Sequence, residues 1–306
     1  MERVISIIVT YNRIDLLKAV LFEYEKMEVC PKEVLVVNNN STDGTFEFLK
    51  LWENKKEKFN KKVINLEENI GGSGGFYIGM EYALLNKKEF DWVYLADDDA
   101  FPEENLFRNF SEIEKKKNIG AICGRVINFE NQKIDLGHRK KISNFGKLKK
   151  IPEKFYKEEK FKLDLFTYVG TFINLKILEK IGNTKKDYFI YFDDTEHSLR
   201  IKKISNIYCY PKLIIKHANQ KNKEISSWRE YYSVRNYLDM IKNHYSIFVF
   251  YYNYYKIFLK KYIKYKIIRN SEENYSLIKE ALKAVNNNEL GIHKKYKPGY
   301  NLLNKD

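Results

Sequence analysis

Hydrophobic runs alternate with amphipathic segments along the first hundred residues. Four short apolar runs have the length and composition of strands: 4–9, 34–37, 63–66 and 92–96. Three segments between them carry apolar side chains at helical spacing: 14–26, 45–54 and 75–85. Because these strands are continuous apolar runs, they indicate a parallel sheet covered on both faces. The pattern predicts an α/β fold with a mostly parallel, doubly wound sheet of the nucleotide-binding type.

Polar clusters follow each of the four predicted strands, at 10–13, 38–44, 69–75 and 97–99. In doubly wound sheets, ligands bind outside the carboxyl ends of the strands. Since parallel strands end at one edge of a sheet, we expect the four clusters to form one site there.

An acidic triplet, Asp97, Asp98 and Asp99, directly follows the fourth predicted strand. Adjacent carboxylates repel one another unless a cation or strong hydrogen-bond donors compensate. Mg²⁺ and Mn²⁺ prefer oxygen ligands of this kind. The triplet therefore favours a divalent metal that bridges phosphates, with a solvated turn as the alternative.

A glycine-rich segment spans residues 69–76. Glycines there let backbone N–H groups approach a ligand closely. The segment follows the third predicted strand and has neither the GxGxxG spacing nor the Walker A pattern. A Rossmann dehydrogenase and a P-loop enzyme are therefore poor fits.

The polar clusters contain four motifs in a fixed order: IVTYNR at 8–13, VVNNNSTDGT at 36–45, NIGGSGGF at 69–76 and DDDA at 97–100. Together they resemble the motif set of inverting family 2 glycosyltransferases with a GT-A fold. GGSGGF followed by DDDA is most similar to the branch with galactofuranosyltransferases and related rhamnosyltransferases. The resemblance covers roughly residues 1–240. It implies a nucleotide-sugar donor and a glycan or polyprenyl-diphosphate-linked saccharide acceptor.

Three features of the second half match the same family. The string FDDTEHSLR at 192–200 is similar to its acidic catalytic-base motif, in which Asp194 takes the place of the base. His217 matches a late metal-binding histidine, and YYSVRN at 231–236 matches a further family string.

The resemblance assigns roles to individual residues. It implies that Asp97, Asp99 and His217 hold Mn²⁺ or Mg²⁺. It also implies a set of residues that contact the nucleotide sugar: Thr10, Tyr11, Arg13, Asn38, Asn69, Gly72, Gly75, Asp97 and Asp98.

General chemistry is consistent with these roles. A metal neutralises a departing diphosphate, and a carboxylate takes the proton of the attacking hydroxyl. Asp193 and Glu196 are rivals of Asp194 for the base. The alternative is that these acids only counter a helix dipole, and that His217 is an ordinary buried histidine.

Two positions depart from the family pattern. The family often has Asp where Asn38 stands, although an amide oxygen still accepts from uracil N3–H. Lys216 replaces an aromatic residue before His217. We expect UDP-galactofuranose as the donor, with dTDP-rhamnose and a rhamnosyltransferase as the alternative.

The net charge of +14 is concentrated in two segments. Residues 138–162 carry nine Lys and one Arg against three Glu, a net charge of +7. Residues 237–269 carry six Lys and one Arg against one Asp, a net charge of +6. The remainder is close to neutral, which argues against a nucleic-acid partner. A non-catalytic basic protein that binds RNA or membrane is the alternative from another functional class.

The two basic segments receive different interpretations. Residues 138–162 are expected to form a mobile insertion, either a solvated excursion or a lid. In 237–269, Lys256, Lys260 and Lys264 recur at helical spacing among aromatic residues. This pattern favours a helix lying in the plane of an anionic membrane surface. The alternative is packing on its own domain or on a second subunit of a homo-oligomer. A final helix, capped by Ser271, is expected to pack against it.

The expected domains are a GT-A domain at 1–236 and a basic, aromatic-rich helical region at 237–306. Within the first, residues 1–100 form the nucleotide-binding half and 163–236 the acceptor half. The three Cys offer no disulfide framework, and the start of the chain does not resemble a signal peptide. The uncharged stretch 245–255 is too short to cross a bilayer. We therefore expect a cytoplasmic protein, peripheral at the cytoplasmic face of the membrane.

Overall fold

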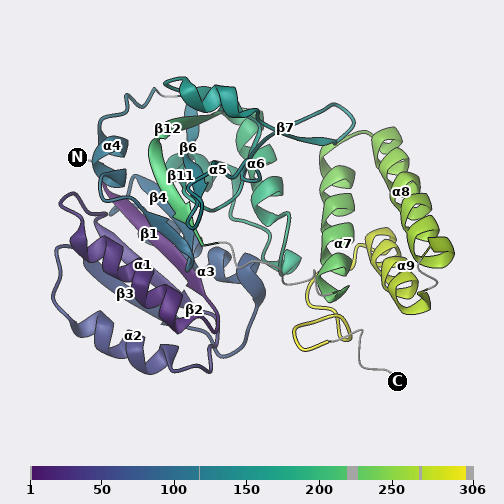
Figure 1. The fold of residues 1–306 in the computed structure, drawn as a ribbon, viewed down its shortest axis with the longest axis horizontal. Helices are drawn as coiled ribbons and strands as arrows, with labels where there is room; N and C mark the ends of the chain where they lie inside the picture. The colour runs from purple at the N-terminus through teal and green to yellow at the C-terminus, as the bar shows by residue number, and fades with distance from the viewer. Residues whose placement is uncertain (1, 117, 219–226, 269–270, 301–306) are drawn as a thin grey trace.

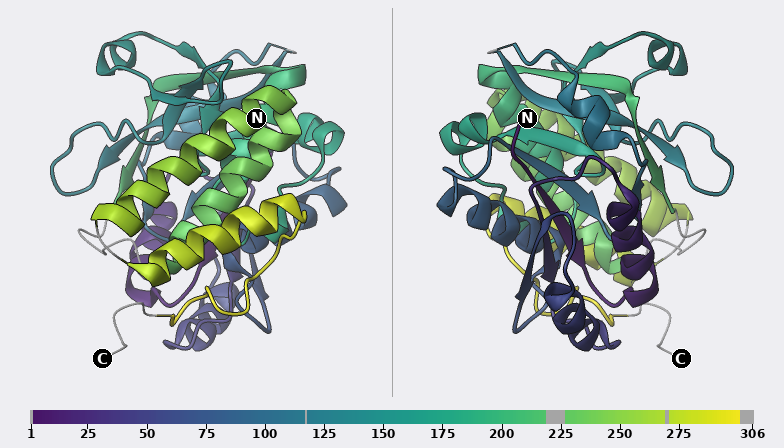
Figure 2. Two further views of the ribbon diagram at one scale, coloured as in Figure 1. Left: turned by 90° about the vertical axis from the view of Figure 1, so that its right-hand side faces the viewer. Right: turned by 90° about the vertical axis from the view of Figure 1, so that its left-hand side faces the viewer.

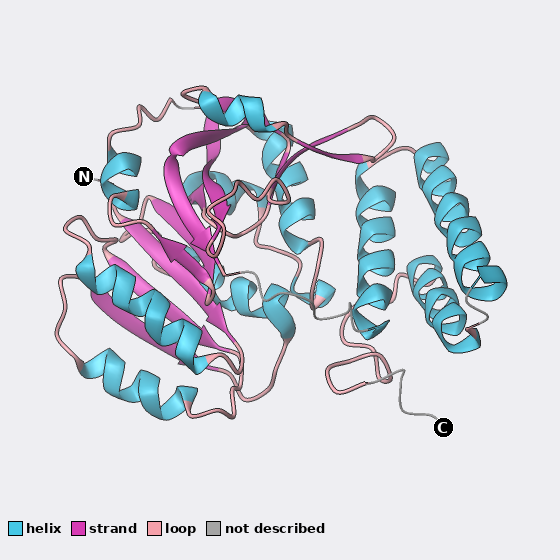
Figure 3. Ribbon diagram, in the orientation of Figure 1, coloured by secondary structure: helices cyan, strands magenta, loops and turns pink. Residues whose placement is uncertain are grey.

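The computed structural model describes residues 2–116, 118–218, 227–268 and 271–300 and has the predicted α/β architecture (Figure 1). Its central sheet contains β1 (Val4–Thr10), β2 (Glu33–Asn38), β3 (Asn60–Asn65), β4 (Trp92–Asp97), β5 (Ala100–Pro102), β6 (Ile119–Asn128), β9 (Phe161–Leu163), β11 (Thr171–Asn174) and β12 (Asn206–His217). The described helices are α1 (Ile14–Lys26), α2 (Thr45–Asn54), α3 (Gly71–Leu85), α4 (Leu106–Ser111), α5 (Leu175–Ile181), α6 (Asp193–Ile204), α7 (Ser227–His244), α8 (Ile247–Tyr262) and α9 (Glu272–Asn286). Short helical turns occur at η1 (Glu153–Lys157), η2 (Lys186–Tyr188) and η3 (Ile263–Ile268). Figure 3 shows the sheet surrounded by helices, with α7, α8 and α9 grouped at one side.

The strand order in the central sheet is β3-β2-β1-β4-β11-β6-β12-β5, and β9 also pairs with β12. Strands β3, β2, β1 and β4 are parallel, as predicted. Alternate side chains of β1 enter two separate cores: Ile8 packs with α1 and α2, whereas Ile7 packs with α3. Burial on both faces explains why the strands are continuous apolar runs.

The second half of the sheet reverses direction twice. Strand β11 is antiparallel to both β4 and β6, and β12 runs parallel to β6. Two reversals restore the original direction, so β6 and β12 end at the same edge as β4. This arrangement brings the end of β12, near residue 217, back to the acidic triplet.

Helix α3 begins earlier than the predicted helix at 75–85, because the glycine run forms its first turns. A Cβ atom on Gly75 would lie 2.5 Å from Val9 Cγ1, and one on Gly79 would lie 2.4 Å from Ile7 Cγ2. These two glycines therefore let α3 pack directly on β1.

The segment expected to be a mobile insertion is part of the folded domain. Its strands β7 (Arg139–Ile142) and β8 (Leu148–Lys150) form a small antiparallel sheet with β10 (Leu165–Phe166). The Arg139 side chain is fully buried and donates to the carbonyl oxygens of Gly124 at 2.9 Å and Val169 at 2.7 Å. A buried guanidinium with satisfied donors fixes the start of the segment against the central sheet.

Helices α7, α8 and α9 form a bundle beside the sheet, seen face on in the left view of Figure 2. The boundary expected at residue 236 falls inside α7, so the helical region begins earlier. Ser271 caps α9 as predicted, but α9 packs chiefly on α7 rather than on α8. The bundle shares a core with Leu165 of β10 and Leu199 of α6, which ties it to the sheet domain.

Candidate functional site

Polar side chains end each parallel strand of the first half of the sheet. Thr10 of β1 is in register with Asn38 of β2, which is in register with Asn65 of β3. Val9 pairs with Asp97, the last residue of β4. The predicted meeting of the polar clusters at one sheet edge is confirmed.

Three side chains at this edge can hold a metal ion. Ligand atoms of Asp97, Asp99 and His217 lie within 4.8 Å of one another. His217 Nε2 is 3.2 Å from Asp99 Oδ1, and His217 Nδ1 is buried without a partner among the described residues. Burial, followed by the charge of Asp99, raises the pKa of Asp97 to about 6. A divalent cation would relieve this repulsion, so the residues fit the implied metal.

A second group of possible ligands shares His217 with the first. Asp135 and His138 also place ligand atoms within 4.8 Å of His217. His138 Nε2 lies 3.3 Å from Asp135 Oδ2, and Nδ1 lies 2.7 Å from Thr167 Oγ1. His138 was not identified from the sequence, because no spacing pattern linked it to residue 217.

The side chain of Asp98 contacts the polar cluster at residues 10–13. Its carboxylate accepts from Thr10 Oγ1 at 2.7 Å and pairs with Arg13 at 3.0 Å. Arg13 also pairs with Asp99. Burial raises the pKa of Asp98 to about 7, although Arg13 opposes the shift. The observed contacts make Asp98 a link between the end of β4 and the loop after β1.

The other predicted nucleotide contacts lie around the same edge. Tyr11 is exposed at the rim. Asn38 donates to Asn65 Oδ1 at 2.8 Å and accepts from the backbone N–H of Ser41 at 3.0 Å. Its side-chain contacts therefore shape the loop that follows β2.

Asn69 and Gly72 lie where the loop after β3 enters α3. Asn69 Oδ1 accepts from Asn39 Nδ2 at 3.0 Å and from the Gly71 N–H at 2.9 Å. Asn39 was missed in the sequence, because one Asn among three in a row gives no signal. A Cβ atom on Gly72 would meet nothing within 4 Å, so Gly72 borders open space, unlike the tightly packed Gly75.

The acidic pair Asp193 and Asp194 begins α6. Asp194 Oδ1 accepts from the backbone N–H and, at 2.9 Å, from Oγ1 of Thr195. Burial raises the pKa of both carboxyl groups, that of Asp193 to about 8. The charges of Lys140 and Arg139 oppose this shift at Asp194, and Asp194 in turn raises the pKa of Asp97. Asp194 therefore lies within electrostatic reach of both Asp97 and the cationic strand β7.

Glu196 has a different environment. It forms an ion pair with Arg200 at 2.8 Å and a hydrogen bond with His244 Nε2 at 3.0 Å. Burial alone would raise the pKa of Glu196, but His244 and Arg200 lower it to about 2. The side chain links α6 to α7, which favours a structural role over proton transfer.

The loop before the acidic pair has an unusual backbone. Phe189, Tyr191 and Phe192 have φ angles of 65°, 67° and 68°, respectively. Asn236 Nδ2 donates to the carbonyl oxygens of Ile190 at 2.8 Å and Tyr191 at 2.9 Å. Asn236, the last residue of the string 231–236, therefore holds the strained loop 189–192 in place. This loop leads directly into Asp193 and Asp194.

Sequence comparison identifies a family and a curated relative. The family model described as glycosyl transferase family 2 matches residues 6–182. The galactofuranosyltransferase GlfT1 of Mycolicibacterium smegmatis is 30% identical over 103 residues, which is 34% of this chain and 32% of that protein. The matched region therefore covers about a third of the length of this relative.

Structure comparison gives two further similarities. S. aureus TarS 1–349 has a TM-score of 0.60 at 15% identity, covering 92% of this chain and 80% of that one. GalNAc-T7, solved with UDP, GalNAc and Mn²⁺, has a TM-score of 0.64 at 14% identity, covering 93% of this chain and 56% of that one. These similarities establish a shared fold over nearly the whole chain.

Proposed function

Because the chain belongs to glycosyltransferase family 2 and has the GT-A fold, we propose that it moves a sugar from a nucleotide-sugar donor to a saccharide acceptor with inversion. Asp97, Asp99 and His217 hold Mn²⁺ or Mg²⁺, and Asp194 is the catalytic base. The observation that carries this proposal is the placement of the metal cluster and Asp194 at one sheet edge, within electrostatic reach of each other.

The proposed chemistry follows from the environments of the proposed metal ligands and of Asp194. A divalent cation, when bound, neutralises charge on the leaving diphosphate. Asp194 accepts the proton from the acceptor hydroxyl as that oxygen attacks the anomeric carbon. The donor C–O bond breaks on the opposite side, so a single displacement inverts the anomeric centre. Of the two acids that begin α6, Asp194 is the better base because Lys140 and Arg139 favour its ionised form.

The proposed donor is UDP-galactofuranose. Two similarities support it: the relative GlfT1 is named a galactofuranosyltransferase, and GalNAc-T7 was solved with UDP. A dTDP-rhamnose donor is the alternative to be separated by experiment.

A thermal-shift panel tests the donor and the metal without an acceptor. UDP with Mn²⁺ should raise the Tm by about 4 °C or more at saturating concentration, because ligand binding favours the folded state by mass action. UDP with EDTA should give a much smaller shift, and GDP with Mn²⁺ serves as the mismatched nucleotide. A larger shift with dTDP-rhamnose than with UDP-galactofuranose would change the donor. No response to any nucleotide would contradict the proposed transferase activity.

We also propose that α8 docks on an anionic membrane surface. None of the helices that the structure describes is long and apolar enough for a bilayer crossing. The outer face of α8 instead exposes large apolar and aromatic side chains: Phe248, Tyr251, Tyr252, Tyr255, Leu259 and Tyr262. Lys256 and Lys260 are exposed beside them, whereas Lys264 is half-buried and donates to Tyr265. An apolar face flanked by lysines suits the headgroup region of anionic lipids.

Flotation with vesicles containing phosphatidylserine tests this surface. Phe248→Ser combined with Leu259→Ser should reduce the bound fraction by about tenfold or more, since both side chains would lose burial in the bilayer. Leu51→Ser with Leu85→Ser removes two exposed apolar side chains outside α8 and should leave binding unchanged. Equal binding of all three proteins, or a dimer in solution that is lost with the α8 variant, would overturn the membrane assignment.

A further inference from the structure

A second group of candidate metal ligands lies beside the cluster of Asp97, Asp99 and His217 and shares His217 with it. The ligand atoms of Asp135, His138 and His217 lie within 4.8 Å of one another. These side chains come from the segment after β6, the residue before β7 and the end of β12. The proposed function uses neither Asp135 nor His138, so the group is unexplained by it.

Backbone pairing at the end of β6 brings this group together. Asn128, the last residue of β6, is in register with His217 of β12. The chain then turns back, and the N–H of Asp135 donates to the carbonyl oxygen of Val126 at 2.9 Å. The same strand end therefore holds both Asp135 and His217 through main-chain contacts.

Hydrogen bonds orient the Asp135 and His138 side chains. Asp135 Oδ1 accepts from the Gly137 N–H at 2.8 Å, and Oδ2 lies 3.3 Å from His138 Nε2. His138 Nδ1 lies 2.7 Å from Thr167 Oγ1, a partner of the kind that fixes the ring of a metal-ligating histidine. Ligands about 2.1 Å from a tetrahedral Zn²⁺ lie about 3.4 Å from each other. The separation of Oδ2 and Nε2 suits such a pair, and it also suits a hydrogen bond, so the third side chain decides between them.

The His217 ring supplies the observation that favours a cation. His217 Nε2 lies 3.2 Å from Asp99 Oδ1. An ionised carboxylate only accepts hydrogen bonds, so Nε2 carries a proton in this contact, and in the neutral ring Nδ1 then holds the lone pair. Nδ1 is buried and has no hydrogen-bond partner among the described residues. A buried lone pair without a donor is costly, and a cation would satisfy it.

The donor set of this group favours Zn²⁺. Two imidazoles and one carboxylate, with a fourth position left for water, are typical of zinc sites. The cluster of Asp97, Asp99 and His217 instead has two carboxylates and one imidazole, which suits the harder cations Mn²⁺ and Mg²⁺. The two groups are therefore matched to different metals.

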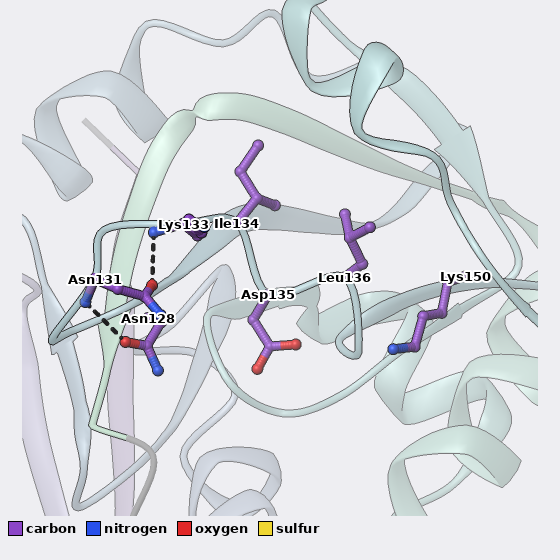
Figure 4. Close-up of a pocket in the computed structure, with 7 residues that line it drawn as sticks. All are labelled: Asn128, Asn131, Lys133, Ile134, Asp135, Leu136 and Lys150. Atoms are coloured by element: carbon purple, nitrogen blue, oxygen red, sulfur yellow. Dashed lines mark hydrogen bonds between the residues drawn. The ribbon is translucent and has the colours of Figure 1, made fainter.

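A polar pocket gives the group access to solvent. The pocket has a volume of about 320 Å³, and Figure 4 shows Asp135 among the side chains that line it. The Asp135 side chain is partly exposed, whereas those of His138 and His217 are largely buried. An ion can therefore enter from the pocket at the carboxylate and meet the two imidazoles behind it.

We infer that Asp135, His138 and His217 form a Zn²⁺ site that competes with the proposed catalytic metal for His217. A neutral imidazole has one nitrogen with a free lone pair. When Nδ1 binds Zn²⁺, the proton stays on Nε2, and the ring cannot ligate a second cation beside Asp97 and Asp99. Zn²⁺ thus removes one ligand from the proposed catalytic metal and lowers the rate of transfer. The site depends only on its own ligands, whereas its effect on transfer rests on the proposed function.

Calorimetric titration of Zn²⁺ into the full chain carrying Asp97→Asn tests the site, because this change weakens binding at the neighbouring cluster. The variant should bind Zn²⁺, and adding Asp135→Asn or His138→Gln should weaken binding by about 100-fold. Asn at position 135 can still accept from the Gly137 N–H, so the turn is retained. Adding His293→Gln instead removes a partly exposed histidine elsewhere and should change the affinity by less than about twofold.

Electron paramagnetic resonance of bound Mn²⁺ tests the competition without an assay of transfer. Zn²⁺ should displace Mn²⁺ from the unsubstituted protein, and Asp135→Asn should raise the Zn²⁺ concentration required by about tenfold or more. Equal sensitivity of the two proteins would place Zn²⁺ at the Asp97 cluster and overturn the inference. Zn²⁺ binding that survives the loss of both Asp135 and His138 would overturn it as well. Absence of sugar transfer with every donor would instead refute the proposed function and leave both metal measurements valid.

Discussion

Replacing Asp194 with Asn is expected to lower kcat for sugar transfer by about 10³-fold, because the amide cannot accept the acceptor proton. The affinity for UDP with Mn²⁺ should stay within about twofold, since the base acts on the acceptor alone. The amide oxygen can still accept the two hydrogen bonds from Thr195. Single-turnover kinetics together with a nucleotide titration would measure both quantities on the same preparation.

Asp193→Asn is the matched control for this experiment. Asp193 is adjacent and more deeply buried than Asp194, and its raised pKa of about 8 makes it a poor proton acceptor at neutral pH. We expect a much smaller loss of kcat in this variant. If Asp193→Asn abolishes transfer while Asp194→Asn retains it, the two roles are reversed. Thermal melts of both variants would show whether either loss reflects unfolding.

Replacing Asp97 or Asp99 with Asn should weaken Mn²⁺ binding by about 100-fold in each case. The loss of an outer-shell partner alone costs a metal site about 10- to 100-fold, and a ligand should cost at least as much. The amide keeps the shape of the side chain but removes the charge that a hard cation requires. Titration of Mn²⁺ followed by electron paramagnetic resonance measures the affinity directly, without an assay of transfer.

The variant Asp135→Asn distinguishes between the two candidate metal-binding groups that share His217. If the metal is held by Asp97, Asp99 and His217, the Asp135 variant should retain Mn²⁺ affinity within about twofold. A large loss in this variant, with normal binding after Asp97→Asn, would move the metal to the group formed by Asp135, His138 and His217. The assignment of the catalytic metal would then be wrong.

Much of the nucleotide half was predictable from local pattern. The helices at 14–26 and 45–54 have the predicted bounds, because their apolar spacing and flanking turns are local signals. The glycine run was harder to place. Glycine is a poor helix former, so the pattern predicted a helix only from residue 75, whereas α3 begins at Gly71. Within α3, close packing on Val9 and Ile7 leaves no room for a residue larger than glycine at Gly75 and Gly79.

The functional site was only partly predictable. The acidic triplet was recognised as a unit, but its three members have different partners. Asp97 and Asp99 converge with His217, whereas Asp98 binds Thr10 and Arg13. These partners are separated by more than eighty positions in the sequence, and no local pattern reports such contacts.

The alternation of strands and helices, the edge at which the polar clusters meet, and the family could all be predicted from the amino-acid sequence. Each depends on short-range periodicity or on ordered motifs. The folded domain fixes which carboxyl groups have cations as close neighbours, which glycines are tightly packed, and how Asn236 holds the loop before Asp193. It also decided that Lys140 and Lys150 face each other across β7 and β8. Those properties depend on burial and on the distances between residues far apart in the chain, which are fixed only when the whole domain packs.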